Sequence, residues 1–380
     1  MMRLDNVRVL TVAGLSLPQS AEIEVAGDTA ERDATGLILA PGLVDLHCHL
    51  RDPGFVDSET LESGALSAAA GGFTRVLAMA NTDPATDRPG LLAELLRRSK
   101  SLPIRAGFVG ALTENLAGKK LTDAVGLKAA GALALSDDGR HAMGRDLLRS
   151  GLEAAAGAGL PVLVHGIKES RGTDPVAEYE GIEEALQVLR EVPGARLHLQ
   201  HISTRRSVDL LRAARADGLR VTAEVTPHHL ALSASDLEGS DARVSPPLRT
   251  SDDREAVVEG LIDGVIDAVA TDHAPHTAAA KAAGANGFHG FETALGVVLG
   301  LRLPWQVLHR ALVEKPREIL GLGPDHDWVL IDPTGEWQVE PRSFHSRGRN
   351  TPLAGRRLRG RVLLTVCRGR IAHRAEVAVG

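Results

Sequence analysis

The 380-residue sequence is poor in cysteine and in aromatic residues. Its two cysteines, Cys48 and Cys367, are too few for a disulfide scaffold or for a zinc module built from cysteines. Phe, Tyr and Trp together make up only 3% of the chain, which argues against a surface on which nucleic-acid bases stack. The formal charge of −6 is also opposite to what nucleic acid or an anionic membrane attracts. A nucleic-acid-binding protein is therefore disfavoured.

Long apolar segments are missing as well. Charged residues interrupt the apolar ones in the opening stretch MMRLDNVRVLTVAG, so no signal peptide is predicted. No apolar run reaches the roughly 18 residues that indicate a spanning helix. Hydrophobic residues at 43% and charged residues at 24% are typical of a globular chain. We therefore expect a cytoplasmic protein with no membrane partner.

Short apolar runs bounded by glycine or proline alternate with Ala- and Leu-rich helical segments through most of the chain. The runs interpreted as buried parallel strands are Leu43–His49, Arg75–Asn81, Ile104–Leu112, Ala132–Asp138, Val162–His165, Leu197–Ile202, Val221–Thr226 and Ala268–Asp272. Helical segments include Glu59–Ala70, Leu91–Arg98, Arg145–Ala156, Gly181–Arg190, Ser207–Ala216 and Arg254–Leu261. This α/β pattern predicts a (β/α)8 TIM-type barrel. A doubly wound open sheet competes, but no G-x-G-x-x-G follows the first strand.

Both ends of the chain differ from this middle part. Residues 1–38 and residues 326–380 contain short strands with turn residues between them. These strands are Val7–Val12, Ala21–Val25, Trp328–Ile331, Val362–Val366 and Arg370–His373. Neither end has enough apolar residues for a core of its own. We therefore expect the two ends to pair into one small β domain beside a barrel formed by residues 39–325.

Histidines collect at the predicted strand ends. Eight of the fifteen lie at or just beyond such an end, namely His47, His49, His165, His201, His228, His229, His273 and His276. A single histidine is more often a surface or core residue than a ligand. In a barrel, however, all these strand ends converge on one face. The clustering therefore indicates a site there.

The segment PGLVDLHCHLRDPG carries the strongest pattern. Side chains alternate along a strand, so His47, His49 and Arg51 share one face, and both imidazoles can reach one cation. Cys48 points the other way and is expected to be a packed core thiol. Arg51 can bind a carboxylate through two parallel hydrogen bonds.

Four further strand ends supply matching groups. They are Asp137 and Asp138 in SDDG, His165 in LVHG, His201 in LQHIST and Asp272 in AVATDHAPH. Only one of Asp137 and Asp138 can face the barrel axis. His198 lies on the opposite face from His201 and is interpreted as structural. Imidazole and carboxylate ligands without thiolate suit Zn²⁺ or a related transition ion, and the set allows two sub-sites.

Several motifs resemble, in the same order, those of the long bacterial type of dihydroorotase in the amidohydrolase superfamily. They are PGLVDLHCHLRDPG, GGFTRVLAMANTDP, SDDG, VTAEVTPHHL, SPPLR, DGVIDAVATDHAPH and GFETALG. The resemblance runs through roughly residues 40–355. It implies a distorted (β/α)8 barrel, a small β-sandwich built from both termini, and a zinc centre.

The resemblance also implies a ligand set. His47, His49 and Asp272 would hold one zinc, His165 and His201 would hold a second, and Asp138 would bridge the two. Hydantoinases and some other relatives use a carboxylated lysine as the bridge, but the fourth strand here ends ALALSDDG without a lysine. No carboxylated lysine is therefore expected. Asp272 would also be catalytic, because it would take a proton from the attacking hydroxide and return it to the leaving ring nitrogen.

The substrate contacts that the resemblance implies are His49, Arg51, Asn81, Ser245, His276, Asn286 and Gly287. This sequence departs from the family at Ser245, where an asparagine is usual, and at Ala80, where a proline is usual. Asn286 stands in place of an apolar aromatic residue, and the stretch HGIKESRGTDP after His165 is short. These differences bear on substrate affinity and identity more than on the hydrolytic chemistry.

The predicted function is that of a zinc-dependent dihydroorotase, which interconverts N-carbamoyl-L-aspartate and L-dihydroorotate in pyrimidine synthesis. A hydantoinase or allantoinase is an alternative that Asp138 and Arg51 disfavour. A non-catalytic barrel that supports aspartate transcarbamoylase is another, which the full set of six ligands disfavours. A second copy of the chain and aspartate transcarbamoylase are the candidate protein partners.

Overall fold

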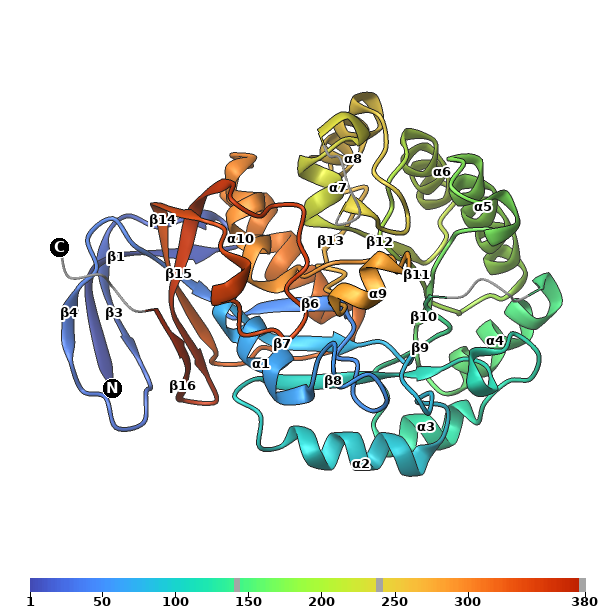
Figure 1. The fold of residues 1–380 in the computed structure, drawn as a ribbon, viewed down its shortest axis with the longest axis horizontal. Coiled ribbons are helices and arrows are strands. Elements are labelled where there is room, and N and C mark those ends of the chain that lie inside the picture. The colour runs from blue at the N-terminus through green and yellow to red at the C-terminus, as the bar shows by residue number, and fades with distance from the viewer. Residues whose placement is uncertain (140–143, 237–241, 376–380) are drawn as a thin grey trace.

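The structure is a computed structural model that describes residues 1–139, 144–236 and 242–375. Within these residues it has two eight-stranded sheets, one in the middle of the chain and one shared by the two ends. The sheet of the chain ends lies at the left of Figure 1, and the helix-covered sheet lies to its right. Among the described helices, none combines the length and the apolar character needed to cross a bilayer.

The middle sheet is a barrel of parallel strands that follow one another in chain order. They are β6 (Leu43–Cys48), β7 (Phe73–Ala78), β8 (Arg105–Ala111), β9 (Ala134–Ser136), β10 (Val162–Val164), β11 (Leu197–Leu199), β12 (Val221–Val225) and β13 (Ala268–Val269). A parallel bridge between Cys48 and His273 joins the end of the first strand to the segment after the last. The predicted (β/α)8 barrel is therefore confirmed, and the open doubly wound sheet is wrong.

Every predicted barrel strand is present, but each ends one to three residues before its predicted end. β11, for example, ends at Leu199, and β13 ends at Val269. The backbone φ angles of His201 and Asp272 are 35° and 47°, in the left-handed region that an extended strand does not contain. Except for His47, which lies within β6, the predicted metal ligands follow the last residue of their strand by one to three positions.

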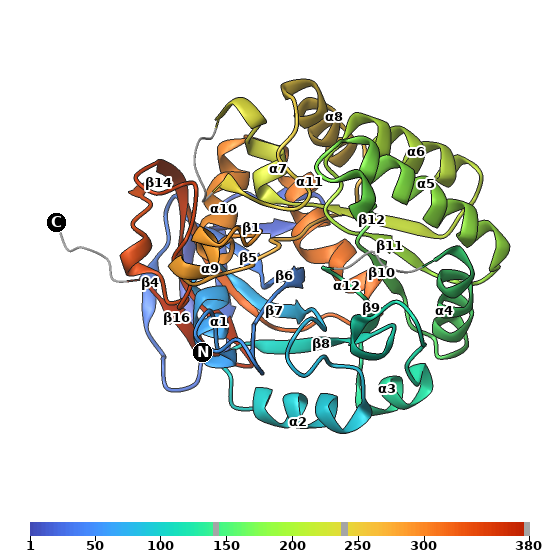
Figure 2. The ribbon, with the colours of Figure 1, turned by 45° about the vertical axis from the view of Figure 1, so that its right-hand side comes forward.

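Helices cover the outside of the barrel strands, as Figures 1 and 2 show. Those that match predicted segments are α1 (Leu61–Ala70), α2 (Pro89–Ser99), α4 (Arg145–Gly157), α5 (Val176–Glu191), α6 (Arg205–Ala216) and α8 (Ser251–Ile262). The others are α3 (Ala124–Ala130), α7 (Pro227–Ala231), α9 (Ala278–Ala282), α10 (Phe291–Gly300), α11 (Trp305–His309) and α12 (Lys315–Ile319). α1 begins after Thr60 because the Thr60 side chain accepts a hydrogen bond from the backbone N–H of Ser63.

The two ends of the chain pair with each other, as predicted. Their strands are β1 (Met2–Thr11), β2 (Gly14–Leu15), β3 (Gln19–Ile23), β4 (Glu31–Asp33), β5 (Ile38–Pro41), β14 (Trp328–Gln338), β15 (Arg357–Cys367) and β16 (Arg370–Arg374). The order is β16-β15-β14-β5-β1-β2, and β3 and β4 also pair with β1. Met2, Leu4, Ile23, Leu39 and Val366 are buried together in a separate apolar cluster. The division into domains at residues 38/39 and 325/326 stays a prediction.

Candidate active site

A cavity of about 620 Å³ lies where the barrel strands end. It brings together side chains from segments that are far apart in the sequence. The predicted site residues that line it are His49, Arg51, Asn81, Asp138, His165, His201, Ser245, Asp272, His276, Asn286 and Gly287. His47 is fully buried behind this lining, and its Nε2 lies 3.4 Å from Asp138 Oδ1. All the predicted site residues are therefore gathered at one end of the barrel.

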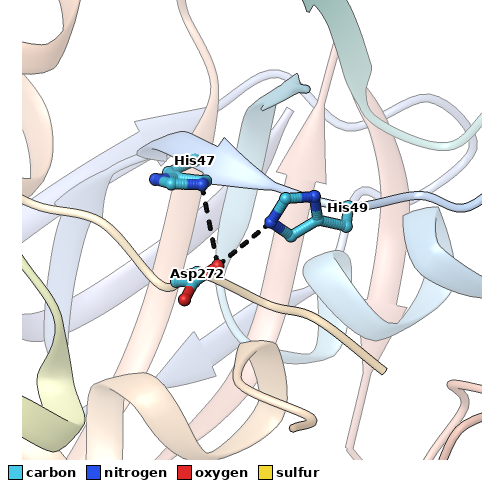
Figure 3. A group of neighbouring side chains, drawn as sticks. All are labelled: His47, His49 and Asp272. Carbon is cyan, nitrogen blue, oxygen red and sulfur yellow. Dashed lines mark hydrogen bonds and ion pairs between the residues drawn. The ribbon is translucent and has the colours of Figure 1, made fainter. Parts of the chain in front are cut away.

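The first group of possible metal ligands consists of His47, His49 and Asp272. Asp272 Oδ1 lies 3.1 Å from His49 Nε2 and 3.6 Å from His47 Nε2. Figure 3 shows both imidazoles turned toward this one carboxylate. The alternation of side chains along β6 places the two rings on the same face, while Cys48 between them is buried and directs its thiol to the backbone oxygen of Leu77. These three side chains have the composition and closeness of a metal site.

Asp138 lies between this group and two further histidines. Its Oδ1 is 3.4 Å from His47 Nε2, 3.4 Å from His165 Nδ1 and 4.0 Å from His201 Nε2. Its Oδ2 is 3.6 Å from His49 Nε2. His165 Nδ1 and His201 Nε2 are themselves 2.8 Å apart. One carboxylate therefore faces all four imidazoles.

The chemistry of these residues fits a transition metal. His47 Nε2 and Asp138 Oδ1 are buried and have no hydrogen-bond partner among the described residues. Ligand atoms held about 2.0–2.1 Å from a tetrahedral zinc lie roughly 3.3 Å apart, which is close to the distances between the ligand atoms here. Burial opposes the charged form of Asp138, but His47 and His165 hold the pKa of its carboxyl well below the usual value. Burial and His165 hold the pKa of His201 well below its usual value. An ionised carboxylate and a neutral imidazole are the forms that bind metals.

Arg51 and its neighbours form a further part of the cavity wall. Arg51 has a left-handed φ of 59°, its Nε donates to the backbone oxygen of Pro275, and its Nη2 lies 3.1 Å from His276 Nε2. Burial lowers the pKa of Arg51 to about 10, so the guanidinium stays charged at neutral pH. Burial and the charge of Arg51 lower the pKa of His276 to about 4, so that ring is neutral. The wall therefore presents one cation beside neutral polar groups.

Asn81, Asn286 and Gly287 complete this wall. Asn81 Oδ1 is 2.9 Å from His49 Nδ1, which turns His49 Nε2 toward Asp272. The backbone oxygen of Asn286 lies 2.7 Å from His276 Nε2. Gly287 has a φ of 110°, and a Cβ at this position would lie 2.5 Å from the Cβ of Ala274. The chain can therefore pass this close to the cavity only with glycine here.

Some residues singled out by sequence have other roles. Asp137 accepts hydrogen bonds from the backbone and side chain of Thr113, which leaves Asp138 as the member of the pair that faces the histidines. His228, His229 and His273 are buried, but none lines the cavity. His229 contacts Thr226 and the backbone oxygen of Pro246, and His273 contacts Glu59. A position at a strand end therefore does not by itself distinguish the histidines that line the cavity from those that do not.

The sequence analysis missed Glu224 and interpreted His198 as structural only. Glu224 Oε1 lies 2.7 Å from His47 Nδ1, and its Oε2 lies 3.0 Å from His198 Nε2. Both residues lie on barrel strands, β12 and β11, and are fully buried. One feature of the sequence could have pointed to Glu224. It is the single carboxylate in the apolar strand VTAEV, and burying a carboxylate is unfavourable unless it has a polar partner.

A (β/α)8 barrel whose first strand carries His-x-His and whose last strand is followed by a carboxylate defines an amidohydrolase of the metal-dependent type. The family model described as "Dihydro-orotase-like" matches residues 36–177. A dihydroorotase of Anaeromyxobacter sp. (strain K) is 40% identical, with 97% of this chain and 94% of that protein covered. A dihydroorotase of Thermus aquaticus is also 40% identical, with 99% and 100% covered. The chain belongs to the dihydroorotase family.

Solved structures show the same fold. An L-hydantoinase (dihydropyrimidinase) from Arthrobacter aurescens is 25% identical with a TM-score of 0.87, and 100% of this chain and 97% of that chain are covered. A dihydropyrimidinase from Brevibacillus agri is 23% identical with a TM-score of 0.84, and 100% and 96% are covered. The likeness extends over both the barrel and the sheet formed by the chain ends.

Proposed function

We propose that this protein is a zinc-dependent dihydroorotase that interconverts N-carbamoyl-L-aspartate and L-dihydroorotate in pyrimidine synthesis. The observation that carries the proposal is that Arg51 lines the same cavity as Asp138 and Asp272 in a chain 40% identical to dihydroorotases over nearly its full length. A guanidinium is the group that recognises a carboxylate on a substrate ring. Hydantoin and allantoin carry no such carboxylate, so the cation favours dihydroorotate over them.

His47, His49 and Asp272 are proposed to hold one zinc, and His165 and His201 a second, with Asp138 between the two. The distances of 3.1–3.6 Å from the carboxylate oxygens to His47, His49 and His165 support this assignment. When bound, zinc supplies a Lewis acid that polarises the amide carbonyl and lowers the pKa of water. Lys168, the lysine after His165, pairs with Glu184 at 2.5 Å, so no lysine is assigned to the bridge.

The chain's own residues are proposed to bind and orient the ring. Arg51, Asn81 and His276 hold the substrate carboxylate, and Ser245 with Asn286 and Gly287 contacts the rest of the ring. Because Arg51 is fixed by its contacts with Pro275 and His276, the carboxylate that it binds sets where the scissile amide lies. Ser245 is shorter than the asparagine usual in the family, so we expect weaker binding from this side of the cavity.

Asp272 is proposed to move the proton. In hydrolysis the oxygen of water bonds to the ring carbonyl carbon, and Asp272 accepts the proton that this water releases. The C–N bond then breaks, and Asp272 delivers the proton to the departing nitrogen, which leaves poorly unless it is protonated. In the synthetic direction the same carboxylate takes the proton from that nitrogen. Asp272 Oδ1 lies 3.6 Å from His47 Nε2 and 3.1 Å from His49 Nε2, which supports a position of this carboxylate beside the reacting atoms.

The test is purification with metal analysis, followed by parallel assays of dihydroorotate, hydantoin and allantoin. We expect two zinc ions per chain and turnover of dihydroorotate only. Turnover of hydantoin or allantoin without dihydroorotate contradicts the proposed substrate. Zinc binding without turnover, followed by activity on adding aspartate transcarbamoylase, identifies that protein as a required partner. The cytoplasmic location and a homodimer remain predictions, which fractionation and sedimentation of the full chain can test.

A further inference from the structure

A line of buried polar side chains leads from the proposed metal ligands toward the barrel interior. His47 Nδ1 contacts Glu224 Oε1 at 2.7 Å, and Glu224 Oε2 contacts His198 Nε2 at 3.0 Å. His198 Nδ1 in turn lies 2.8 Å from Thr222 Oγ1. The line joins β6, which carries His47, to β12 and β11, which carry Glu224 and His198. His198 and Thr222 are neighbours because they are paired in the register of β11 and β12. The line begins at Nδ1 of His47, on the other side of the ring from Nε2, which faces Asp138 and Asp272.

The burial of the Glu224 carboxylate is unfavourable unless polar groups contact it. Its exposed fraction is 0%, and its strand neighbours Ala223 and Val225 are buried apolar residues. The side chains that contact its carboxylate, within the described part of the chain, are the rings of His47 and His198. Burying a carboxylate is unfavourable unless hydrogen bonds replace its water. An apolar side chain would pack in this strand at lower cost, so the carboxylate serves the two rings.

The contacts with Glu224, of which the one to His47 Nδ1 is shorter than that from Gln200 Nε2 at 3.2 Å, place a proton on one nitrogen of each ring. An ionised carboxylate only accepts hydrogen bonds, so His47 donates to it from Nδ1 and His198 donates from Nε2. His198 Nδ1 is then an acceptor, and the Thr222 hydroxyl donates to it. With Nδ1 held by Glu224, Nε2 is the nitrogen that faces Asp138 Oδ1 at 3.4 Å and Asp272 Oδ1 at 3.6 Å. This is the ring orientation that a metal ligand bound through Nε2 needs.

We propose that Glu224 is a positioning residue that holds His47 in its metal-binding tautomer and orientation, and that His198 and Thr222 hold Glu224 in turn. The inference rests on the metal centre proposed above. Outer carboxylates that hold a ligating histidine typically contribute about 10- to 100-fold to metal affinity. Glu224 therefore acts on the reaction only through His47 and touches neither substrate nor metal.

The test compares zinc affinity in the wild-type protein, Glu224→Gln and Glu292→Gln. Zinc is removed and then titrated back against a chromogenic chelator. Glutamine keeps the shape of Glu224 but turns one acceptor oxygen into a donor, so one of the two rings loses its partner. We expect zinc affinity to fall about 10- to 100-fold. Glu292→Gln is the matched control: Glu292 is a mostly buried carboxylate that accepts from Ser67 and the backbone of His345, and we expect unchanged zinc affinity.

A second measurement does not depend on zinc or on the folding of a variant. In wild-type protein labelled with ¹⁵N-histidine, we expect the His47 Nδ1 proton at the low-field position of a strong hydrogen bond. His47 Nδ1 without an attached proton, or equal zinc affinity in Glu224→Gln and wild type, overturns the inference. Failure of the wild-type protein to bind zinc overturns the proposed metal centre instead, and the His47 spectrum still decides the role of Glu224.

Discussion

Asp138 Oδ1 faces His47 Nε2 at 3.4 Å, and neither of these buried atoms has a hydrogen-bond partner within the part of the chain that the structure describes. Buried polar atoms are almost always satisfied, since leaving one unpaired costs about 1–3 kcal/mol. The same oxygen lies 3.4 Å from His165 Nδ1, so one carboxylate is shared by the two proposed sub-sites. The metal content of the protein should therefore depend on Asp138 more than on any single histidine.

Asp138→Ala should lose metal from both sub-sites, because the variant removes the one group common to them. We expect less than half of the wild-type zinc per chain, measured by elemental analysis, together with loss of turnover. If a side-chain carboxylate takes the bridging place, as proposed, stripping bicarbonate before zinc is restored should leave wild-type activity unchanged. Detection of a carboxylated lysine by mass spectrometry of the intact protein would contradict this assignment.

Arg51→Lys should lower kcat/KM for dihydroorotate at least about tenfold, equivalent to roughly 1.4 kcal/mol, with zinc content intact. Lysine keeps the charge but has no planar fork, so it cannot hold a carboxylate at two points. Arg205→Lys is the control, since Arg205 pairs with Asp252 on the exposed outside of the barrel and should leave kinetics unchanged. If kcat/KM is the same in Arg51→Lys and Arg205→Lys, Arg51 is not a substrate contact.

Asp272→Asn should retain at least part of the zinc while turnover falls about 10²–10⁴-fold in both directions, the usual contribution of general acid–base catalysis. Asparagine keeps an oxygen for the metal but cannot carry the proton. It also tolerates the left-handed backbone, where Asp272 has a φ of 47°, so the variant changes the chemistry more than the fold. If one preparation of Asp272→Asn holds the full zinc content and turns over at near the wild-type rate, Asp272 does not transfer the proton.

Leu4→Ala should destabilise the sheet formed by the chain ends by about 2–5 kcal/mol, since Leu4 is fully buried in the separate apolar cluster there. If residues 1–38 and 326–380 are a domain of their own, calorimetry should show one unfolding transition lowered and zinc content unchanged. Leu17→Ala is the control, because Leu17 is 83% exposed. A single transition that shifts as a whole would argue against the predicted domain division.

The grouping of the candidate metal ligands could be predicted because alternation along a strand and the convergence of strand ends are local and general rules. His47 and His49 follow from alternation alone, and Asp272 follows from its place after the last strand. The choice of Asp138 over Asp137 needed the structure, since only three-dimensional packing shows Thr113 beside Asp137. The predicted strands also extend too far toward their C-terminal ends. The left-handed turn at His201, for example, is not marked by glycine or proline in the sequence.

Glu224 and His198 could not be assigned because their partners are distant in sequence. His47 and Glu224 are separated by 177 positions and meet only when β6 and β12 belong to the same barrel. The sequence pattern ranked His198 by its face on the strand, but alternation does not show what lies across the barrel. A lone charged residue inside an apolar strand is the feature that should prompt a search for such a partner.

The burial of Cys48 has a practical consequence for spectroscopy. Cys48 is 0% exposed and Cys367 is 1% exposed, and burial raises the pKa of the first thiol well above its usual value and that of the second to about 12. Only the thiolate reacts readily with maleimides, so both native cysteines should resist labelling in the folded protein. A cysteine introduced on the surface, for example by Leu17→Cys, should then carry a fluorophore or spin label at a single known position.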